Sequence, residues 1–390
     1  MNVLMVIGSY YPEVTGGAVQ CQLLIKTLKE KVRFLVLTTT RDMVLPRQSK
    51  VDGVDVIRIP IWEKNRIDYF IAFFRFISFF LYRRKDFQIV HLHGFTAKSI
   101  LLIFLSKLFH KKIIIKMSSI GHDDPLAMGN RGFFLHQFFS KANAYVGVSK
   151  QFKSIYRNSD LPADRFKLIP NGVDTKRFCF VSNREKRRLR QQFGLPLELK
   201  IILFVGHFSK DKCPDVLIKA WKGCVADAYP DSSVVFIGTK DSVHYEVDAD
   251  VVKEVKRLAS TYQGNRVFFV ERTHKIEKYY QASDIFVMPS LREGLPNAML
   301  EAMSCELPVI VSELKGVTDW VVEDGVNGLL ISPGSEVELS DAIIRLLNNS
   351  NFSIELGRKA SKTIIERFTV EEIAKQYKKL YMNSMNVLQE

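Results

Sequence analysis

Two glutamates and a proline in the second half of the chain have the types and spacing that would bind a nucleoside diphosphate. They lie in LREGLPNAMLEAMS (residues 291–304), where loop-type residues pass into a helical apolar pattern. Pro296 suits the first turn of a helix, because an N–H group has no intrahelical partner there. The backbone N–H groups of that turn and the positive end of the helix dipole favour a bound phosphate. The stretch therefore predicts a helix whose amino terminus holds a diphosphate.

Glu293 and Glu301 would contact different parts of such a nucleotide. Glu301 lies more than one turn inside the helix, about 7–8 Å along the axis from Pro296. A carboxylate there can accept hydrogen bonds from both hydroxyl groups of a ribose. Glu293 lies outside the helix, beside the bound group. The alternative is a helix with an ordinary capping acid and one surface glutamate. The residues expected to contact the nucleotide in this stretch are Gly294, Leu295, Pro296, Asn297 and Glu301.

Two further loops follow apolar runs and carry residues suited to a phosphate or a sugar. VGHFSKDKCPDVL (205–217) places Lys212 shortly before Pro214, where a cation would neutralise a leaving diphosphate. GSYYPEVTGGA (8–18) places Gly16 and Gly17 before a helix, where the backbone can approach a ligand closely. Neither loop is a Walker A or dinucleotide fingerprint. The alternatives are a solvated lysine and a tight strand-to-helix turn.

Alternating strand and helix patterns would position these loops. Short apolar runs predict buried parallel strands, and helical patterns lie between them. Strands are expected at 2–8, 33–39, 54–60, 87–94, 111–119, 144–150 and 166–174 in the first half, and at 200–208, 232–238, 265–271, 283–290, 307–312 and 327–333 in the second. The fold class is therefore α/β, with two doubly wound Rossmann-like domains that leave a cleft at the carboxyl ends of their strands.

Composition agrees with two domains in a reducing compartment. The 390 residues are 47% hydrophobic, which is enough for two cores. Five dispersed cysteines without a C-x-x-C pair indicate reduced thiols, as in a cytosolic protein. The first residues follow a strand pattern and do not resemble a signal peptide.

The net charge of +14 belongs almost wholly to the first half of the chain. Residues 1–175 hold 26 Lys and Arg against 13 Asp and Glu. Such a surplus predicts an anionic partner, namely a membrane surface, a nucleic acid or an acidic substrate. No aromatic–basic pattern of an RNA-binding protein accompanies it, so nucleic acid is not expected. The alternative is a basic face that only keeps the protein soluble.

One aromatic stretch resembles a membrane segment but is too short to be one. DYFIAFFRFISFFLY (68–82) carries Arg75 near its centre, and only 14 residues separate Asp68 from Arg83. A helix that spans a bilayer needs about 20 residues. The stretch predicts either a helix packed on the sheet or a helix lying in a membrane interface, with the basic residues 83–85 among anionic headgroups.

Taken together, the ordered segments resemble glycosyltransferase family 4, the retaining sugar-nucleotide transferases of the GT-B fold. The resemblance covers nearly the whole chain. Its segments are YPEVTGGA, VSK, IPNGVD, FVGHFSKDKCPDVLIKAW, ASDIFVMPSLREGLPNAMLEAMSCELPVIVS and GVTDWVVEDGVNGLLISP. It implies an acceptor-side domain at 1–175, a donor-binding domain at 176–370, and a helix at 371–390 that returns toward the first domain.

The resemblance also implies roles for the residues that match the family's motifs. Glu301 would hold the donor ribose, and Glu293 would lie beside the donor sugar. Lys212 would contact the diphosphate, and His207 of the same loop would assist it. Gly16 and Gly17 would lie against the donor.

On the acceptor side, three residues are candidates. VHLHG places His91 and His93 on one face of a strand, and the resemblance puts His93 near the acceptor. KMSSIGHDDP (116–125) adds His122 and Asp123 by a loose match. The His-x-His pair lacks a third metal ligand, and no Asp-x-Asp motif is well placed. No metal is therefore expected.

The activity so implied is transfer of a sugar, with retention, from a UDP-sugar or GDP-sugar to a hydroxyl group of a glycan. The acceptor is expected to be lipid-linked and to belong to cell-surface polysaccharide synthesis, with the protein cytoplasmic and peripheral on the inner membrane. The anionic membrane partner follows from the basic first half. The alternatives are a sugar-nucleotide isomerase (epimerase) of the same fold and an inactive protein that only binds nucleotide sugars.

Three positions depart from the family pattern. His207 stands where an arginine is usual, Glu306 where a glycine is usual, and Asp319 where a longer glutamate is usual. A left-handed backbone at 306 would strain a non-glycine residue by about 1–2 kcal/mol. The shorter side chain of Asp319 leaves its contact with sugar or phosphate open.

The first prediction concerns His207. If its protonated ring stabilises the diphosphate, activity declines as the pH rises past about 6.5–7. We expect His207→Arg to keep or raise the transfer rate and His207→Ala to lower it. Equal rates for the three proteins would show that the position has no role.

Overall fold

The chain folds into two compact units. The computed structural model describes residues 1–13, 15–61, 66–238, 247–262, 265–271 and 273–386. The first unit comprises Met1–Gly172 and Val370–Glu390, and the second comprises Val173–Thr369. The first boundary lies three residues before the expected one and falls inside the IPNGVD segment.

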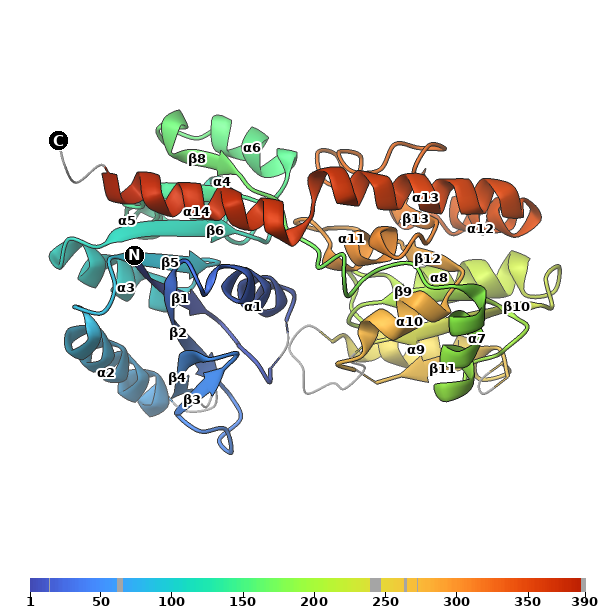
Figure 1. The fold of residues 1–390 in the computed structure, drawn as a ribbon, viewed down its shortest axis with the longest axis horizontal. Coiled ribbons are helices and arrows are strands. Elements are labelled where there is room, and N and C mark those ends of the chain that lie inside the picture. Colours follow the sequence, from blue (N-terminus) through green and yellow to red (C-terminus); the bar gives the residue numbers. More distant parts are fainter. Residues whose placement is uncertain (14, 62–65, 239–246, 263–264, 272, 387–390) are drawn as a thin grey trace. The chain divides into compact units, whose positions relative to one another are not determined.

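The first unit is built on an eight-stranded sheet of order β3-β4-β2-β1-β5-β6-β7-β8 (Figure 1). The strands are β1 (Asn2–Ile7), β2 (Arg33–Thr40), β3 (Gln48–Val51), β4 (Val54–Pro60), β5 (Ile89–His93), β6 (Lys112–Met117), β7 (Ala144–Gly147) and β8 (Phe166–Leu168). All neighbours are parallel except β3 and β4. The sequence analysis missed β3. Its signal was the Asp52-Gly53 pair, because both residues have the positive φ of a two-residue hairpin turn.

Helices cover both faces of this sheet. They are α1 (Gly16–Leu28), α2 (Arg66–Arg83), α3 (Ala97–Leu108), α4 (Pro125–Asn130), α5 (Phe133–Phe139), α6 (Lys150–Arg157) and α14 (Val370–Asn386). The last of these packs beside α1, and Tyr377 and Tyr381 enter the same core as Met5 and Ile25 (Figure 1). The carboxyl-terminal helix is thus part of the first unit.

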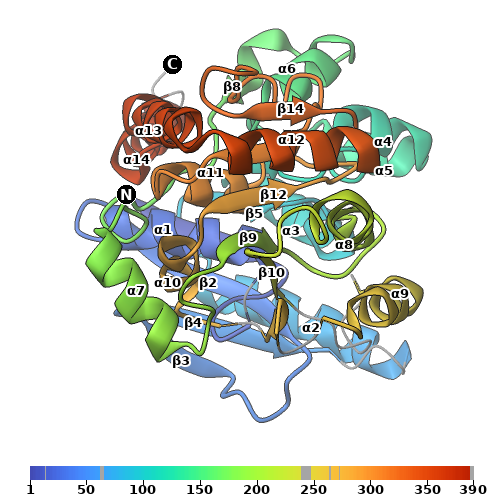
Figure 2. The ribbon, with the colours of Figure 1, turned by 90° about the vertical axis from the view of Figure 1, so that its right-hand side faces the viewer.

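The second unit has a six-stranded parallel sheet of order β11-β10-β9-β12-β13-β14. Its strands are β9 (Lys200–Val205), β10 (Ser232–Ile237), β11 (Val267–Val270), β12 (Ile285–Met288), β13 (Val309–Ser312) and β14 (Leu329–Ile331). Its α-helices are α7 (Asn183–Gln192), α8 (Pro214–Ala220), α9 (Ala249–Ala259), α10 (Ile276–Ala282), α11 (Asn297–Ser304), α12 (Glu336–Asn348) and α13 (Ser350–Arg367). In Figure 2, α8 and α9 lie on one side of the strands, and α7 and α10 lie on the other.

Each sheet has one point where the winding of the chain reverses. In the first unit it lies between β1 and β5, and in the second between β9 and β12. Loops that leave the carboxyl ends of the two strands at such a point diverge to opposite faces and leave a crevice. Both units therefore expose a crevice-forming pair of loops. Among the described residues, no helix is long and apolar enough to cross a bilayer.

The condition under which Glu306 would be strained is met in the structure. Glu306 has a φ of 60°. Its carbonyl oxygen also lies against Gly357 of α13, where an added Cβ would be only 2.0 Å away. The turn at Glu306 therefore packs tightly against α13, although a positive φ is unfavourable for a residue with a side chain.

We expect Glu306→Gly to stabilise the second unit by about 0.5–1 kcal/mol, because glycine adopts a positive φ without strain. Glu355→Gly, inside α13 and with a side chain that is 62% exposed, is the matched control and should destabilise it by about 1 kcal/mol. Calorimetric unfolding of both variants would measure this. A loss of stability in Glu306→Gly would mean that its side chain makes a compensating contact.

Candidate functional site

The crevice of the second unit contains the loops with the predicted lysine and glutamate. Strands β9 and β12 pair in parallel, and the loops 206–213 and 289–296 follow them. Lys212 Nζ lies 2.5 Å from Glu293 Oε1. The lysine side chain is 30% exposed and the glutamate side chain only 8%. Two residues 81 positions apart thus form a partly buried ion pair at the point where the winding reverses.

Neighbouring contacts fix these two loops to each other. Arg292 donates to the Asp211 carboxylate at 2.7 Å, and the Leu291 amide donates to the Asp211 carbonyl at 2.8 Å. In the sequence, Lys212 comes directly after Asp211, and Glu293 comes directly after Arg292. Its geometry is therefore set by the loops and not only by the two flexible side chains.

His207 lies half-buried in the same loop as Lys212. The Ser209 amide donates to the His207 carbonyl at 3.0 Å, and the Lys212 amide donates to the Ser209 carbonyl at 3.1 Å. The loop is thus a compact series of turns. Gly238, after β10, approaches it so closely that an added Cβ would lie 1.9 Å from the Gly206 carbonyl oxygen. Only glycine fits there.

Helix α11 begins at Asn297, so Pro296 lies one position before the first turn in which the sequence analysis placed it. Pro296 is its N-cap and makes no side-chain capping bond. Glu301 lies one turn further in and is half-buried. The hydroxyl group of Tyr280, on α10, donates to Glu301 Oε2 at 3.1 Å. Burial raises the pKa of Glu301 to about 7, although this bond and the charge of Arg177 favour the ionised form.

The first residues of the second unit hold α10 in place. Arg177 donates to Glu277 at 2.7 Å and to the His274 carbonyl at 2.7 Å. Gln281 donates to the Cys179 carbonyl at 3.2 Å. These bonds position the helix that carries Tyr280, so the Glu301 carboxylate is oriented through a partner that sequence reasoning missed. No spacing rule links residues 280 and 301.

In the first unit, three of the predicted residues flank the reversal point. Gly16 and Gly17 begin α1 after β1, and Thr15 caps that helix by accepting from the Ala18 amide at 3.3 Å. A Cβ on Gly17 would meet only Ile7, at an ordinary 3.9 Å. Packing therefore does not require glycine at 17. His93 ends β5, the other strand of the pair.

A buried polar cluster surrounds His93. Its register partner on β6 is Lys116, whose Nζ donates to Asn171 Oδ1 at 3.0 Å. Asp123 folds back to accept from the Ser118 and Ser119 amides. Among the described residues, neither ring nitrogen of His93 has a hydrogen-bond partner. The imidazole therefore retains its hydrogen-bonding capacity.

Burial moves the charged members of this cluster toward neutrality. It lowers the pKa of Lys116 to about 8 and raises the pKa of Asp123 to about 6. It also holds the pKa of His93 well below the usual value, with His91 and Lys116 adding to the effect. Such shifts are typical of functional sites. Sequence reasoning missed Lys116, although a lysine inside the apolar strand KIIIKM was a usable signal.

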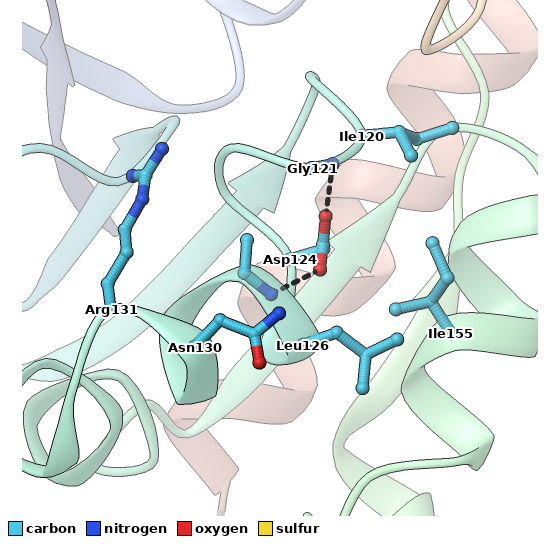
Figure 3. Close-up of a pocket in the computed structure, with 8 residues that line it drawn as sticks. Ile120, Gly121, Asp124, Leu126, Asn130, Arg131 and Ile155 are labelled. Carbon is cyan, nitrogen blue, oxygen red and sulfur yellow. Dashed lines mark hydrogen bonds between the residues drawn. The ribbon is translucent and has the colours of Figure 1, made fainter.

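His122 does not join its neighbour Asp123. Its side chain and carbonyl lie beside Arg131, which donates to the carbonyl at 3.0 Å and lies 3.2 Å from Nδ1. Arg131 also lines a pocket of about 280 Å³ with Asp124, Leu126 and Ile155 (Figure 3). Asp124 bonds to the Gly121 and Ala127 amides there. The structure thus places Asp123 beside Gly94 and close enough to Lys116 to affect its pKa, whereas the His122 side chain is exposed.

The remaining predictions concern Asp319 and metal binding. Asp319 accepts from the Gly316 amide at 2.6 Å and so fixes the loop after β13. Within the described parts of the chain, no group of three His, Cys, Asp or Glu residues could hold a metal ion. The expectation of metal-independent activity stays a prediction.

Comparison with known proteins agrees with this arrangement. Residues 14–177 match a family described as Glycosyltransferase Family 4, and residues 185–363 match one described as Glycosyl transferases group 1. An uncharacterized glycosyltransferase of Methanocaldococcus jannaschii is 24% identical over 100% of both chains. A D-inositol 3-phosphate glycosyltransferase of Corynebacterium aurimucosum is 24% identical over 77% of this chain and 73% of its own length. Anabaena HepE, solved with UDP-glucose, superposes with a TM-score of 0.79 at 19% identity, covering 98% of this chain and 100% of HepE.

The raised pKa of Glu301 predicts a pH-dependent affinity for nucleotide sugars. If Glu301 accepts hydrogen bonds from two ribose hydroxyl groups, binding favours the ionised carboxylate, which is the stronger acceptor. Affinity should rise with pH up to about 7 and level off above it, with up to about a tenfold loss per unit below. Titration calorimetry with UDP-glucose and GDP-mannose would measure this, since their diphosphates do not titrate in this range.

Glu301→Gln is the control for titration elsewhere in the protein. It should bind more weakly, and the pH dependence attributed to Glu301 should be absent. A pH profile shared by both proteins would assign the titration to another group.

Proposed function

The chain belongs to the glycosyltransferases of the GT-B fold, and we propose that it moves a sugar from a uridine or guanosine diphosphate sugar to a hydroxyl group of a glycan. The observation that carries the proposal is the ion pair of Lys212 and Glu293 beside the amino terminus of α11. The pair puts one cation and one carboxylate where a diphosphate and its sugar would meet. HepE, of the same fold, was solved with UDP-glucose.

Lys212 would stabilise the leaving group. As the bond between the sugar C1 and the phosphate oxygen breaks, negative charge gathers on the diphosphate. An ammonium and oriented backbone N–H groups at this place lower the energy of that charge. When the site holds no diphosphate, Glu293 keeps the Lys212 ammonium in position. Little reorganisation is then needed when the diphosphate becomes the new partner of the lysine.

Glu301 would bind the ribose. Tyr280 uses one lone pair of Oε2, which leaves Oε1 and the remaining lone pair for two adjacent hydroxyl groups. Glu293 would then lie toward the sugar, on the far side of the diphosphate. This division of work between the two glutamates follows from their places outside and inside α11.

The family resemblance supports retention, in which the acceptor hydroxyl attacks from the side that the diphosphate leaves. In the first unit, His93, Lys116 and Asp123 supply polar groups for that acceptor. The basic first half supports a lipid-linked acceptor on the cytoplasmic face of a membrane, as in cell-surface polysaccharide synthesis. Metal is not required in this scheme, because Lys212 supplies the positive charge.

Substitutions of Lys212 and Glu301 should change different quantities, namely kcat and nucleotide affinity. We expect Lys212→Ala to lower kcat about 100-fold or more with a small change in nucleotide affinity, since it acts mainly on the developing charge. Glu301→Ala should weaken the binding of UDP or GDP about tenfold or more, since it loses the ribose contact. Thermal shift and calorimetry with both nucleotides identify the base, and turnover of the preferred nucleotide sugar gives kcat.

Lys210→Ala is the matched control. Lys210 lies two residues before Lys212 but is 74% exposed and pairs with Asp248. It should keep normal binding and turnover. Normal nucleotide binding in Glu301→Ala would overturn the ribose assignment, and failure of both nucleotides to bind would overturn the donor site.

A further inference from the structure

Helix α2 is apolar on both its inner and its outer face. Ala72, Phe76 and Phe80 are buried against the first unit. On the opposite side, Phe70 is 64% exposed and Phe74 is 51% exposed. A surface helix normally carries polar residues there, and a helix that is apolar all round is a buried one. The outer face of α2 therefore has the composition of a covered surface.

The neighbouring helices extend this surface. Helix α3 contacts α2 on one side and α5 on the other, and the three follow one another along the left side of the first unit in Figure 1. Phe104 on α3 is 55% exposed, and Phe133 and Phe134 on α5 are 71% and 79% exposed. We call the exposed apolar side chains of these helices the aromatic face, with Phe70, Phe73, Phe74, Phe104, Phe133 and Phe134 as its main members. Within the aromatic face, Phe74 contacts Phe70 and Phe73, and Phe133 contacts Phe134. Exposed apolar patches mark interaction sites.

Cations are frequent in the same part of the chain. The segment 66–112, from α2 to the start of β6, carries nine Lys and Arg against two Asp. Of these, Lys98 is directed into the unit and donates to the Ile7 carbonyl at 2.8 Å. Burial and the positive charges of Arg165, Lys112 and Lys141 lower the pKa of Lys107, at the end of α3. Lys107 therefore lies among other positive charges. An external anion would reduce the electrostatic repulsion between them.

We propose that the aromatic face binds the surface of an anionic lipid bilayer. Exposed aromatic side chains would enter the headgroup region while the lysines and arginines contact anionic headgroups. A second copy of the chain would bring two sets of cations together, and a nucleic acid would leave the phenylalanines in water. The inference rests on the lipid-linked acceptor of the proposed function. It names the surface that would bring the first unit to a membrane holding such an acceptor.

Vesicle flotation of the full chain tests the inference. The vesicles are phosphatidylcholine alone, or phosphatidylcholine with phosphatidylglycerol. We expect the protein to float only with the anionic vesicles. Phe70→Ser/Phe74→Ser should reduce the bound fraction by about tenfold or more, because it removes the inserting side chains. Lys85→Glu/Lys107→Glu should do the same by reversing two charges on exposed side chains.

Ile354→Ser/Ile365→Ser is the matched control. Both isoleucines are more than half exposed, at 53% and 60%, but lie on α13 of the second unit. This variant should float like the unchanged protein. Nucleotide binding, measured on every variant, checks folding and separates this inference from the donor site.

Three results would overturn the inference. The first is equal flotation of the protein with neutral and anionic vesicles, and the second is equal flotation of the unchanged protein and the Phe70→Ser/Phe74→Ser variant. The third is a dimer in solution that this same variant converts to a monomer, since the aromatic face would then be an interface between copies of the chain.

Discussion

The ion pair between Lys212 and Glu293 is the constraint on which the site depends. A carboxylate that is 8% exposed is costly to leave charged without a partner. The lysine supplies that partner, and the contacts of Asp211 with residues 291 and 292 hold the two loops at the required separation. The loops are thus ordered around the Lys212 ammonium. In the proposed function, a diphosphate would replace Glu293 as the partner of this cation.

Sheet order explains why these loops meet. In each unit the winding reverses once, and the loops after the two strands at that point diverge to opposite faces. In the second unit these loops carry Lys212 and Glu293, and in the first they carry the start of α1 and His93. Each unit therefore carries candidate site residues at the same topological position.

The first unit has two different outer surfaces. Helix α14 packs beside α1 and contributes tyrosines to the core, so that side of the sheet is covered by the chain itself. On α2, α3 and α5, large aromatic side chains remain exposed next to lysines and arginines. The charge surplus of the first half is thus concentrated where apolar side chains are also exposed. The proposed membrane surface rests on this combination of positive charge and exposed aromatic side chains.

The sequence by itself determined the motif residues and most local elements, although not β3, because strand and helix patterns and the proline before α11 act over a few positions. It located Lys212, Glu293 and Glu301 on the correct loops and helix. Only the tertiary structure decided their partners. Tyr280 reaches Glu301, Lys116 lies beside His93, and His122 turns away from Asp123. These contacts follow from strand order and helix packing, which bring together residues that no local pattern connects.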